Sequence, residues 1–92
     1  MDTNTSYLVG RVRAYCEKFH PGDEEVRFRA FTFMIYSDGA LYVSQRITPA
    51  CVSVLLEVDN RGVRYHGSEE LLHNELLPLL DEALVLEDLA DV

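Results

Sequence analysis

The chain has 92 residues, of which 48% are hydrophobic, and its formal net charge is −8. This length supports one core, so we predict a single domain over residues 1–92 with a stability of about 5–10 kcal/mol. The composition excludes a disordered chain, and no apolar run approaches the ~20 residues that a membrane span needs. The polar start MDTNTSYLVG lacks the features of a signal peptide, so we expect a cytoplasmic protein without a membrane partner.

The charge is unevenly distributed along the chain. Residues 1–64 hold eight acidic and eight basic side chains, whereas residues 65–92 hold eight acids and no Lys or Arg. The whole imbalance therefore lies in the C-terminal segment. A segment of that sign is repelled by nucleic acid and attracted to basic surfaces.

Apolar side chains recur at helical spacing near the N-terminus. They are Leu8, Val12, Tyr15, Cys16 and Phe19. This stripe predicts an amphipathic helix over about residues 5–19, with Thr3 or Thr5 as its N-cap and Pro21 beyond its end. A strand is the alternative, because apolar or small residues also occupy every second position from 8 to 16.

The next stretch, VRFRAFTFMIYSDGALYVSQRI at residues 26–47, is organised around Asp38-Gly39. Asp-Gly between alternating apolar runs predicts a two-stranded hairpin with a two-residue type I′ turn. In that register Tyr36 faces Leu41 and Phe33 faces Ser44. One face is then expected in the core, with Phe28, Ala30, Thr32, Met34, Tyr36, Leu41, Val43 and Ile47.

A second hairpin follows the first. Residues 50–58 are rich in β-branched side chains, and residues 63–66 return as a short strand. The intervening residues 59–62, DNRG, predict a type I turn followed by a glycine with positive φ. The two hairpins in series predict a four-stranded antiparallel meander, because their link is too short for a crossover helix.

A leucine-rich helix is predicted after Ser68, which suits an N-cap position. Pro78 should kink this helix near Leu77, because proline removes a backbone donor and clashes with the preceding turn. We expect one stripe to cover the sheet, consisting of Leu72, Leu76, Leu79 and Leu86. The remaining leucines should form an exposed apolar strip that supports a homodimer, centred on Leu77, Leu80 and Leu84.

Together these elements predict an α+β fold. It has an N-terminal helix, a four-stranded antiparallel meander of two hairpins and a kinked acidic C-terminal helix. Both helices are expected to pack on one face of the sheet. In size, acidity and layout such a chain resembles small chaperones of secretion effectors and phage-encoded inhibitors of host defence.

The residues capable of catalysis or metal binding show no recognisable spacing. Cys16 and His20 have helical spacing, but the other histidines, His66 and His73, lie on different elements, so no zinc site is predicted. The chain has no phosphate-binding glycine motif and no nucleophile elbow. We therefore expect no enzyme activity, no metal and no cofactor, and we expect Cys16 and Cys51 to remain reduced.

Two surfaces are candidates for binding. The first is the acidic side of the C-terminal helix, with Glu69, Glu70, Glu75, Asp81, Glu82, Glu87, Asp88 and Asp91. The second is the other face of the first hairpin, where aromatic residues lie beside arginines. Its candidate binding residues are Arg27, Arg29, Phe31, Phe33, Tyr42 and Arg46.

The acidic surface predicts docking on a basic site of a protein partner. The protein would then be a small non-enzymatic inhibitor or binding protein, such as a phage anti-defence (anti-CRISPR-like) protein, a nucleic-acid mimic or an antitoxin-like immunity protein. One alternative is a dimeric assembly or secretion-chaperone-like subunit. A less favoured alternative is a binder of single-stranded nucleic acid, with the aromatic residues stacking on bases and the arginines contacting phosphates.

Overall fold

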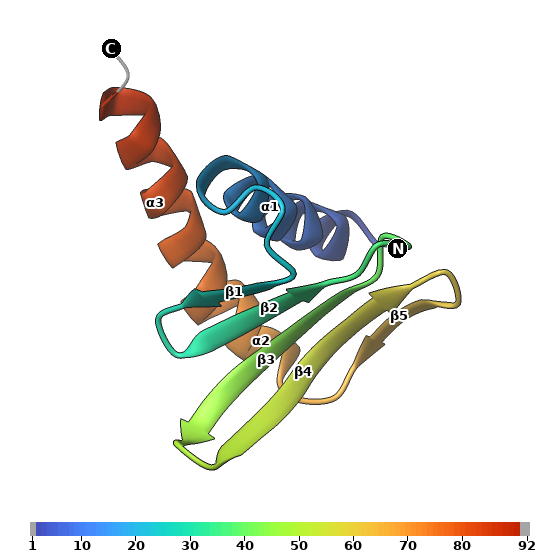
Figure 1. Cartoon of the computed structure of the whole chain (residues 1–92). Coiled ribbons are helices and arrows are strands. Elements are labelled where there is room, and N and C mark those ends of the chain that lie inside the picture. Colours follow the sequence, from blue (N-terminus) through green and yellow to red (C-terminus); the bar gives the residue numbers. More distant parts are fainter. Residues whose placement is uncertain (1, 91–92) are drawn as a thin grey trace. The chain divides into compact units, whose positions relative to one another are not determined.

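The computed structural model describes residues 2–90 of the chain, and the side chains of residues 2–85. It confirms the α+β class, with helices and an antiparallel sheet of five strands, one more than predicted (Figure 1). The chain divides into a helical unit, Met1–Pro21 with Glu70–Val92, and a sheet unit, Gly22–Glu69. The predicted packing of both helices on one sheet face concerns both units and stays a prediction.

The N-terminal element is a helix, α1 (Thr3–Phe19), so the strand alternative is wrong. Its N-cap is Asp2 and neither Thr3 nor Thr5, because the Asp2 side chain accepts a hydrogen bond from the Thr5 backbone N–H at 2.7 Å. This bond lowers the pKa of Asp2, since it favours the charged carboxylate. The helix ends before Pro21 as predicted, and its buried side chains are Thr5, Leu8, Val9, Val12 and Cys16.

The C-terminal helical segment is interrupted before Pro78. A single turn, α2 (Glu69–Leu71), leads into a π-helical turn, η1 (Leu72–Leu76), and then α3 (Leu77–Ala90). The Leu77 N–H bonds to the Leu72 carbonyl, five residues back. The predicted interruption is therefore a wider turn just ahead of the proline, which cannot donate a backbone hydrogen bond. Within the helical unit, α1 and α3 are in contact.

The sheet unit is a meander in which each strand pairs with the next. The strand order is β1-β2-β3-β4-β5, and every pairing is antiparallel. The strands are β1 (Glu25–Phe28), β2 (Phe31–Ile35), β3 (Leu41–Thr48), β4 (Cys51–Asp59) and β5 (Gly62–Tyr65). β3 and β4 are the longest, so their hairpin extends beyond the neighbouring strands (Figure 1).

The additional strand arises from a turn that the sequence pattern did not reveal. β1 and β2 were predicted as one strand, but the chain reverses at Arg29 and Ala30, so that Phe28 pairs with Phe31. Arg29 has φ +55, a conformation that glycine or asparagine usually supplies. Because neither residue type is present here, the turn had no local signature.

The predicted register of the central hairpin was wrong by one residue. Tyr36 and Ala40 close a three-residue loop, in which the Gly39 N–H donates to the Tyr36 carbonyl at 2.9 Å. Gly39 has φ +89, and the Asp38 carboxylate accepts from the Ala40 N–H at 3.0 Å. Asp-Gly thus forms part of a longer loop instead of a two-residue turn, and the shift reverses the faces of β3 relative to β2.

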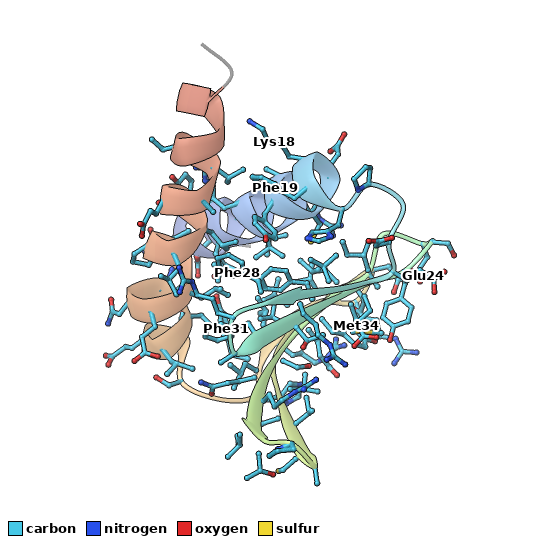
Figure 2. The ribbon with its side chains drawn as sticks, turned by 60° about the vertical axis from the view of Figure 1, so that its left-hand side comes forward. Lys18, Phe19, Glu24, Phe28, Phe31 and Met34 are labelled. Carbon is cyan, nitrogen blue, oxygen red and sulfur yellow. The ribbon has the colours of Figure 1, made fainter. Side chains whose placement is uncertain are left out.

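The corrected register defines a buried face and an outer face of the sheet. One cross-strand row on the buried face is Val26, Phe33, Val43, Leu56 and Tyr65. The first four members of this row are buried, and Phe33 is fully so. The predicted core residue Met34 instead lies on the outer face, opposite Tyr42, and is only half-buried (Figure 2).

The two remaining hairpins agree with the expected turns. Residues 49 and 50 join β3 to β4, and the turn before β5 has Gly62 at φ +126, as the sequence predicts for a glycine with positive φ. Register irregularities occur in the β3–β4 pairing between Val43 and Ser44 and again near Ile47. Beside the first of them, the consecutive residues Leu55 and Leu56 are both buried, which alternation alone would not produce.

Candidate functional site

The acidic side of the C-terminal helical segment contains both exposed and paired carboxylates. Glu75, in η1, and Glu82, in α3, are both exposed on the side away from the buried leucines. Pro78 and Val85 are exposed as well. The described part of this side is therefore acidic with an apolar component.

The carboxylates of Glu70, Glu75 and Glu82 have no cationic partner among the described residues. Glu69 and Glu70 are exposed at the start of α2. The side chains of Glu87 and Asp88, and the whole of Asp91, lie outside the described residues. Of the predicted acidic surface, the structure therefore describes the side chains of Glu69, Glu70, Glu75, Asp81 and Glu82.

Among the acids of this set whose side chains the structure describes, Asp81 has a cationic partner. Its Oδ1 lies 2.7 Å from Nε of Arg11 and accepts a longer hydrogen bond, 3.3 Å, from the Tyr7 hydroxyl. The Arg11 guanidinium also lies 5.8 Å from the centre of the Tyr7 ring. These contacts join α1 to α3, so Asp81 has a structural role within the helical unit.

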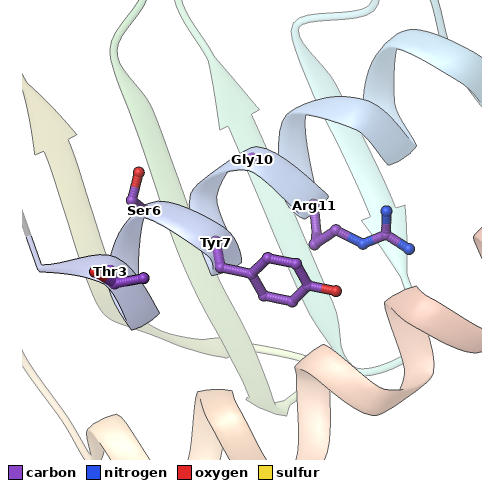
Figure 3. A pocket seen from close by; sticks show the side chains of 5 residues that line it. All are labelled: Thr3, Ser6, Tyr7, Gly10 and Arg11. Carbon is purple, nitrogen blue, oxygen red and sulfur yellow. The ribbon is translucent and has the colours of Figure 1, made fainter.

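A shallow surface depression lies beside this cluster on α1. It is lined by Thr3, Ser6, Tyr7, Gly10 and Arg11, and Figure 3 shows how these residues lie along the helix. Its lining includes three residues with a hydroxyl group and one with a guanidinium, but the Arg11 Nε is already bonded to Asp81. No catalytic pairing of a nucleophile with a base occurs among these five residues.

The predicted exposed leucine strip is wrong. Leu80 is fully buried and Leu84 is 6% exposed, while Leu77 is half-buried. The buried stripe consists of Leu72, Leu76, Leu80 and Leu84, with a constant spacing of four residues. In a regular α-helix, Leu79 would be buried in this stripe and Leu80 would not. The wide turn at η1 accounts for the burial of Leu80 instead.

The predicted arginine–aromatic face is divided between the two sides of the sheet. Phe31 and Phe33 lie in the core, at 4% and 0% exposure, so they cannot stack on a ligand. Arg27 and Arg46 occupy the outer face, and Arg29 lies in the exposed β1–β2 turn. Tyr42 is half-buried on the outer face, with its ring 5.1 Å from that of Tyr36.

The outer face also carries an ion-pair network that the sequence analysis missed. Arg64 on β5 contacts two β4 carboxylates, with Nη2 2.6 Å from Asp59 and Nε 3.1 Å from Glu57. His66 Nε2 lies 3.0 Å from the same Glu57 carboxylate. Glu57 and Arg64 are direct cross-strand partners, so the predicted hairpin at residues 59–62 contained the signal.

These contacts determine the direction of two pKa shifts. The bond from His66, followed by that from Arg64, lowers the pKa of Glu57 because both stabilise the carboxylate. The bond from Arg64, with the Arg61 backbone N–H, lowers the pKa of Asp59. Arg64 therefore balances two acids and is not an available cation.

The two cysteines have different environments. Cys16 is buried in α1, and desolvation raises the pKa of its thiol to about 11. Cys51 is exposed at the start of β4. In the part of the chain that the structure describes, no three His, Cys, Asp or Glu side chains gather as a metal site would require.

Comparison with known proteins adds no identity. No protein-family model, no curated protein and no solved structure matches the chain. Among the described residues, no helix is long and apolar enough to cross a membrane.

Proposed function

We propose that this protein is a small acidic binding protein that docks on a basic surface of a protein partner. The observation that carries the proposal is the exposed pair Glu75 and Glu82, which have no cationic partner among the described residues. They lie in a segment, residues 65–92, that contains no Lys or Arg. Such a segment attracts a basic surface through its long-range field.

The docking face would combine charge with a small apolar contact. Glu75 and Glu82 supply carboxylates, and Val85 contributes an exposed apolar side chain on the same side of α3. Residues 86–92 contain three further acids and no Lys or Arg, so the sequence adds negative charge beyond Val85. Occupation of a basic site that otherwise binds DNA or RNA would make such a protein an inhibitor, as in phage anti-defence or antitoxin systems.

The described side chains favour neither alternative function. A dimeric assembly subunit could associate through a sheet edge or through the leucine face of the C-terminal helix, and in that face Leu80 and Leu84 are buried. The nucleic-acid binder required stacking on Phe31 and Phe33, which are buried as well. We therefore propose neither.

A charge-reversal experiment tests the docking face. The natural host is extracted, proteins captured by the wild type are identified, and capture is repeated with Glu75→Lys/Glu82→Lys. We expect this variant to lose a basic partner that the wild type retains, and we expect added salt to weaken wild-type binding steeply. The matched control is Glu17→Lys/Glu24→Lys, which changes the net charge equally at two exposed positions elsewhere.

Equal loss of the partner in both double variants would show that only total charge matters and would contradict a specific docking face. Capture that is insensitive to salt would contradict the electrostatic mechanism. The circular dichroism spectrum and the melting temperature of each variant establish that the fold is retained.

A further inference from the structure

Three arginines come together at one end of the outer sheet face. Arg27 pairs with Thr32, and Arg46 follows two residues after Ser44, the Thr32 partner on β3. The Arg46 N–H donates to the Ala30 carbonyl at 2.8 Å, which places the turn residue Arg29 beside β3. The three guanidinium groups therefore arise from neighbouring positions on β1, the β1–β2 turn and β3.

The charges of these arginines are available to a ligand. Arg27 makes only a long contact with Glu25, 3.9 Å between Nε and Oε1, and both side chains are more than half exposed. Arg29 and Arg46 are exposed and form no ion pair with any acid whose side chain the structure describes. Their environment is the opposite of that of Arg64, which two carboxylates neutralise.

Exposed apolar side chains lie next to the arginines. Val52 pairs with Arg46, and Val54 pairs with Ser44, so both valines lie on the outer face at 54% and 37% exposure. Arg46 and Val52 lie on the part of the β3–β4 hairpin that extends past β2, because the pairing of β2 with β3 ends at Phe31 and Gln45. Arg27, Arg29, Arg46, Val52 and Val54 together form what we call the arginine–valine patch.

The turn at Arg29 is a further unusual feature of the patch. Its φ of +55 lies in the left-handed region, which costs an ordinary L-residue about 1–2 kcal/mol and which glycine or asparagine would occupy more readily. Strained residues of this kind are concentrated at binding sites. Here the residue with this backbone conformation is itself charged and exposed, and it lies in the turn at the edge of the patch.

We propose that the arginine–valine patch binds an acidic segment of another protein, with carboxylates on the arginines and apolar side chains on Val52 and Val54. Guanidinium groups match the planar carboxylate, often with two parallel hydrogen bonds. A protein segment fits better than nucleic acid, because branched aliphatic side chains can cover the exposed valines, whereas single-stranded nucleic acid offers mainly phosphates, sugars and base faces. The buried Phe31 and Phe33 also leave no stacking platform beside the arginines.

This inference is independent of the proposed function, because the patch belongs to the sheet unit and the acidic docking face to the helical unit. The patch can therefore be tested with a defined ligand. The probe is a short fluorescent peptide that alternates Glu or Asp with Val or Leu. Its controls are the same peptide with Lys in place of the acids, and a labelled single-stranded oligothymidine.

We expect the acidic peptide to bind the wild type, as measured by fluorescence anisotropy, and to bind Arg27→Glu/Arg46→Glu at least about tenfold more weakly. The matched control is Arg61→Glu, which reverses an exposed arginine in the β4–β5 turn and should leave binding nearly unchanged. Val52→Thr should weaken binding, whereas the exposed Val85→Thr on α3 should not. Glu75→Lys/Glu82→Lys should retain the peptide, so failure of the proposed function can be told apart from failure of this inference.

Arg29→Asn separates binding from a structural role. Asparagine tolerates the left-handed conformation, so the melting temperature should be retained or raised, while peptide affinity falls. Three results would overturn the proposal. The acidic peptide does not bind the wild type, Arg61→Glu loses as much peptide affinity as Arg27→Glu/Arg46→Glu, or oligothymidine binds more tightly than the peptide through the same arginines. Self-association that Arg27→Glu/Arg46→Glu abolishes would also overturn it, because the occupant would then be a second copy of the chain.

Discussion

Arg11 and Asp81 connect the two long helices of the chain through an ion pair, with 2.7 Å between Nε and Oδ1. The two side chains come from α1 and α3 and are 29% and 38% exposed. Partial exposure weakens such a pair through solvent screening, so its contribution is expected to be modest. Its geometric effect is to anchor an acid that would otherwise belong to the external acidic surface.

A double-mutant cycle measures this contact. Arg11→Gln and Asp81→Asn should each lower the free energy of unfolding by about 0.5–1 kcal/mol, and the double variant should lose less than the sum. The measurement is urea denaturation of the four proteins at low and high salt. Strictly additive losses would contradict a direct interaction between the two side chains.

Gly10 offers a route to greater stability. It is exposed in the middle of α1, and a Cβ added there would meet no atom within 4 Å. Gly10→Ala should therefore raise the free energy of unfolding by about 0.5–1 kcal/mol, because alanine restricts the unfolded chain and favours the helix. Thermal and urea denaturation measure the gain.

Gly67 provides the matched control for this substitution. A Cβ at Gly67 would lie 2.8 Å from Cδ2 of Leu55, a buried side chain that would have to shift. Gly67→Ala should consequently give no gain, in contrast to Gly10→Ala. A loss of stability in Gly10→Ala would show that this glycine has a role that the exposed helix surface does not reveal.

The sequence was sufficient where local chemistry determines the structure. The apolar spacing of α1 and its termination before Pro21 are direct consequences of helix geometry. The turn between Asp59 and Gly62 was found for the same reason, since Gly62 supplies the positive φ. The order of the strands in the meander follows from the short links between them. The reversal at Arg29, which adds the fifth strand, was not predicted.

The errors arose where a local pattern admits two geometries. Asp38 and Gly39 fit both a two-residue and a three-residue loop, and this difference of one residue exchanged Phe33 for Met34 in the core. The π-helical turn likewise changed which leucines are buried, because its effect depends on packing beyond the local sequence. The candidate acidic surface could be located by composition, but the pairing of Asp81 with Arg11 required the contact between α1 and α3.

The network on the outer sheet face predicts a specific pH dependence. The pKa values of Glu57 and Asp59 are lower in the folded state than in the unfolded state. Both carboxylates therefore stabilise the fold at a pH above their pKa values in the unfolded chain. This contribution should be lost as the pH falls from about 5 through the lower folded pKa values. Arg64→Gln should reduce this acid-dependent loss, as measured by the free energy of unfolding at successive pH values.

Arg61→Gln is the comparison for that measurement, because its exposed side chain forms no ion pair with the described acids and its charge lowers the pKa of Asp59 less than the bond from Arg64 does, so its effect should be the smaller one. Comparison of variant with wild type at each pH removes the general effect of relieving negative charge. Parallel curves for the wild type and Arg64→Gln would contradict the assignment of the pH dependence to this network.

The two cysteines should differ in reactivity. Cys51 is exposed, whereas Cys16 is buried and its pKa is raised to about 11, so little thiolate forms at neutral pH. A thiol reagent should modify Cys51 rapidly in the native protein and Cys16 only as the protein unfolds. Cys51→Ser should remove the rapid phase alone, and rapid modification of both thiols would contradict the burial of Cys16.

The buried stripe of the C-terminal helices provides the sharpest test of the structure. Regular helical spacing predicts Leu79 in the core, whereas the wide turn at η1 places Leu80 there with no exposed surface. Leu80→Ala should lower the free energy of unfolding by about 2–5 kcal/mol, as expected for a cavity in a packed core. Leu79→Ala removes the same atoms from a half-buried position and should cost clearly less. Urea denaturation of the two variants decides between the registers. A greater loss in the free energy of unfolding for Leu79→Ala would mean that the helix continues without the wide turn. The side chains beyond Pro78 would then follow regular α-helical spacing.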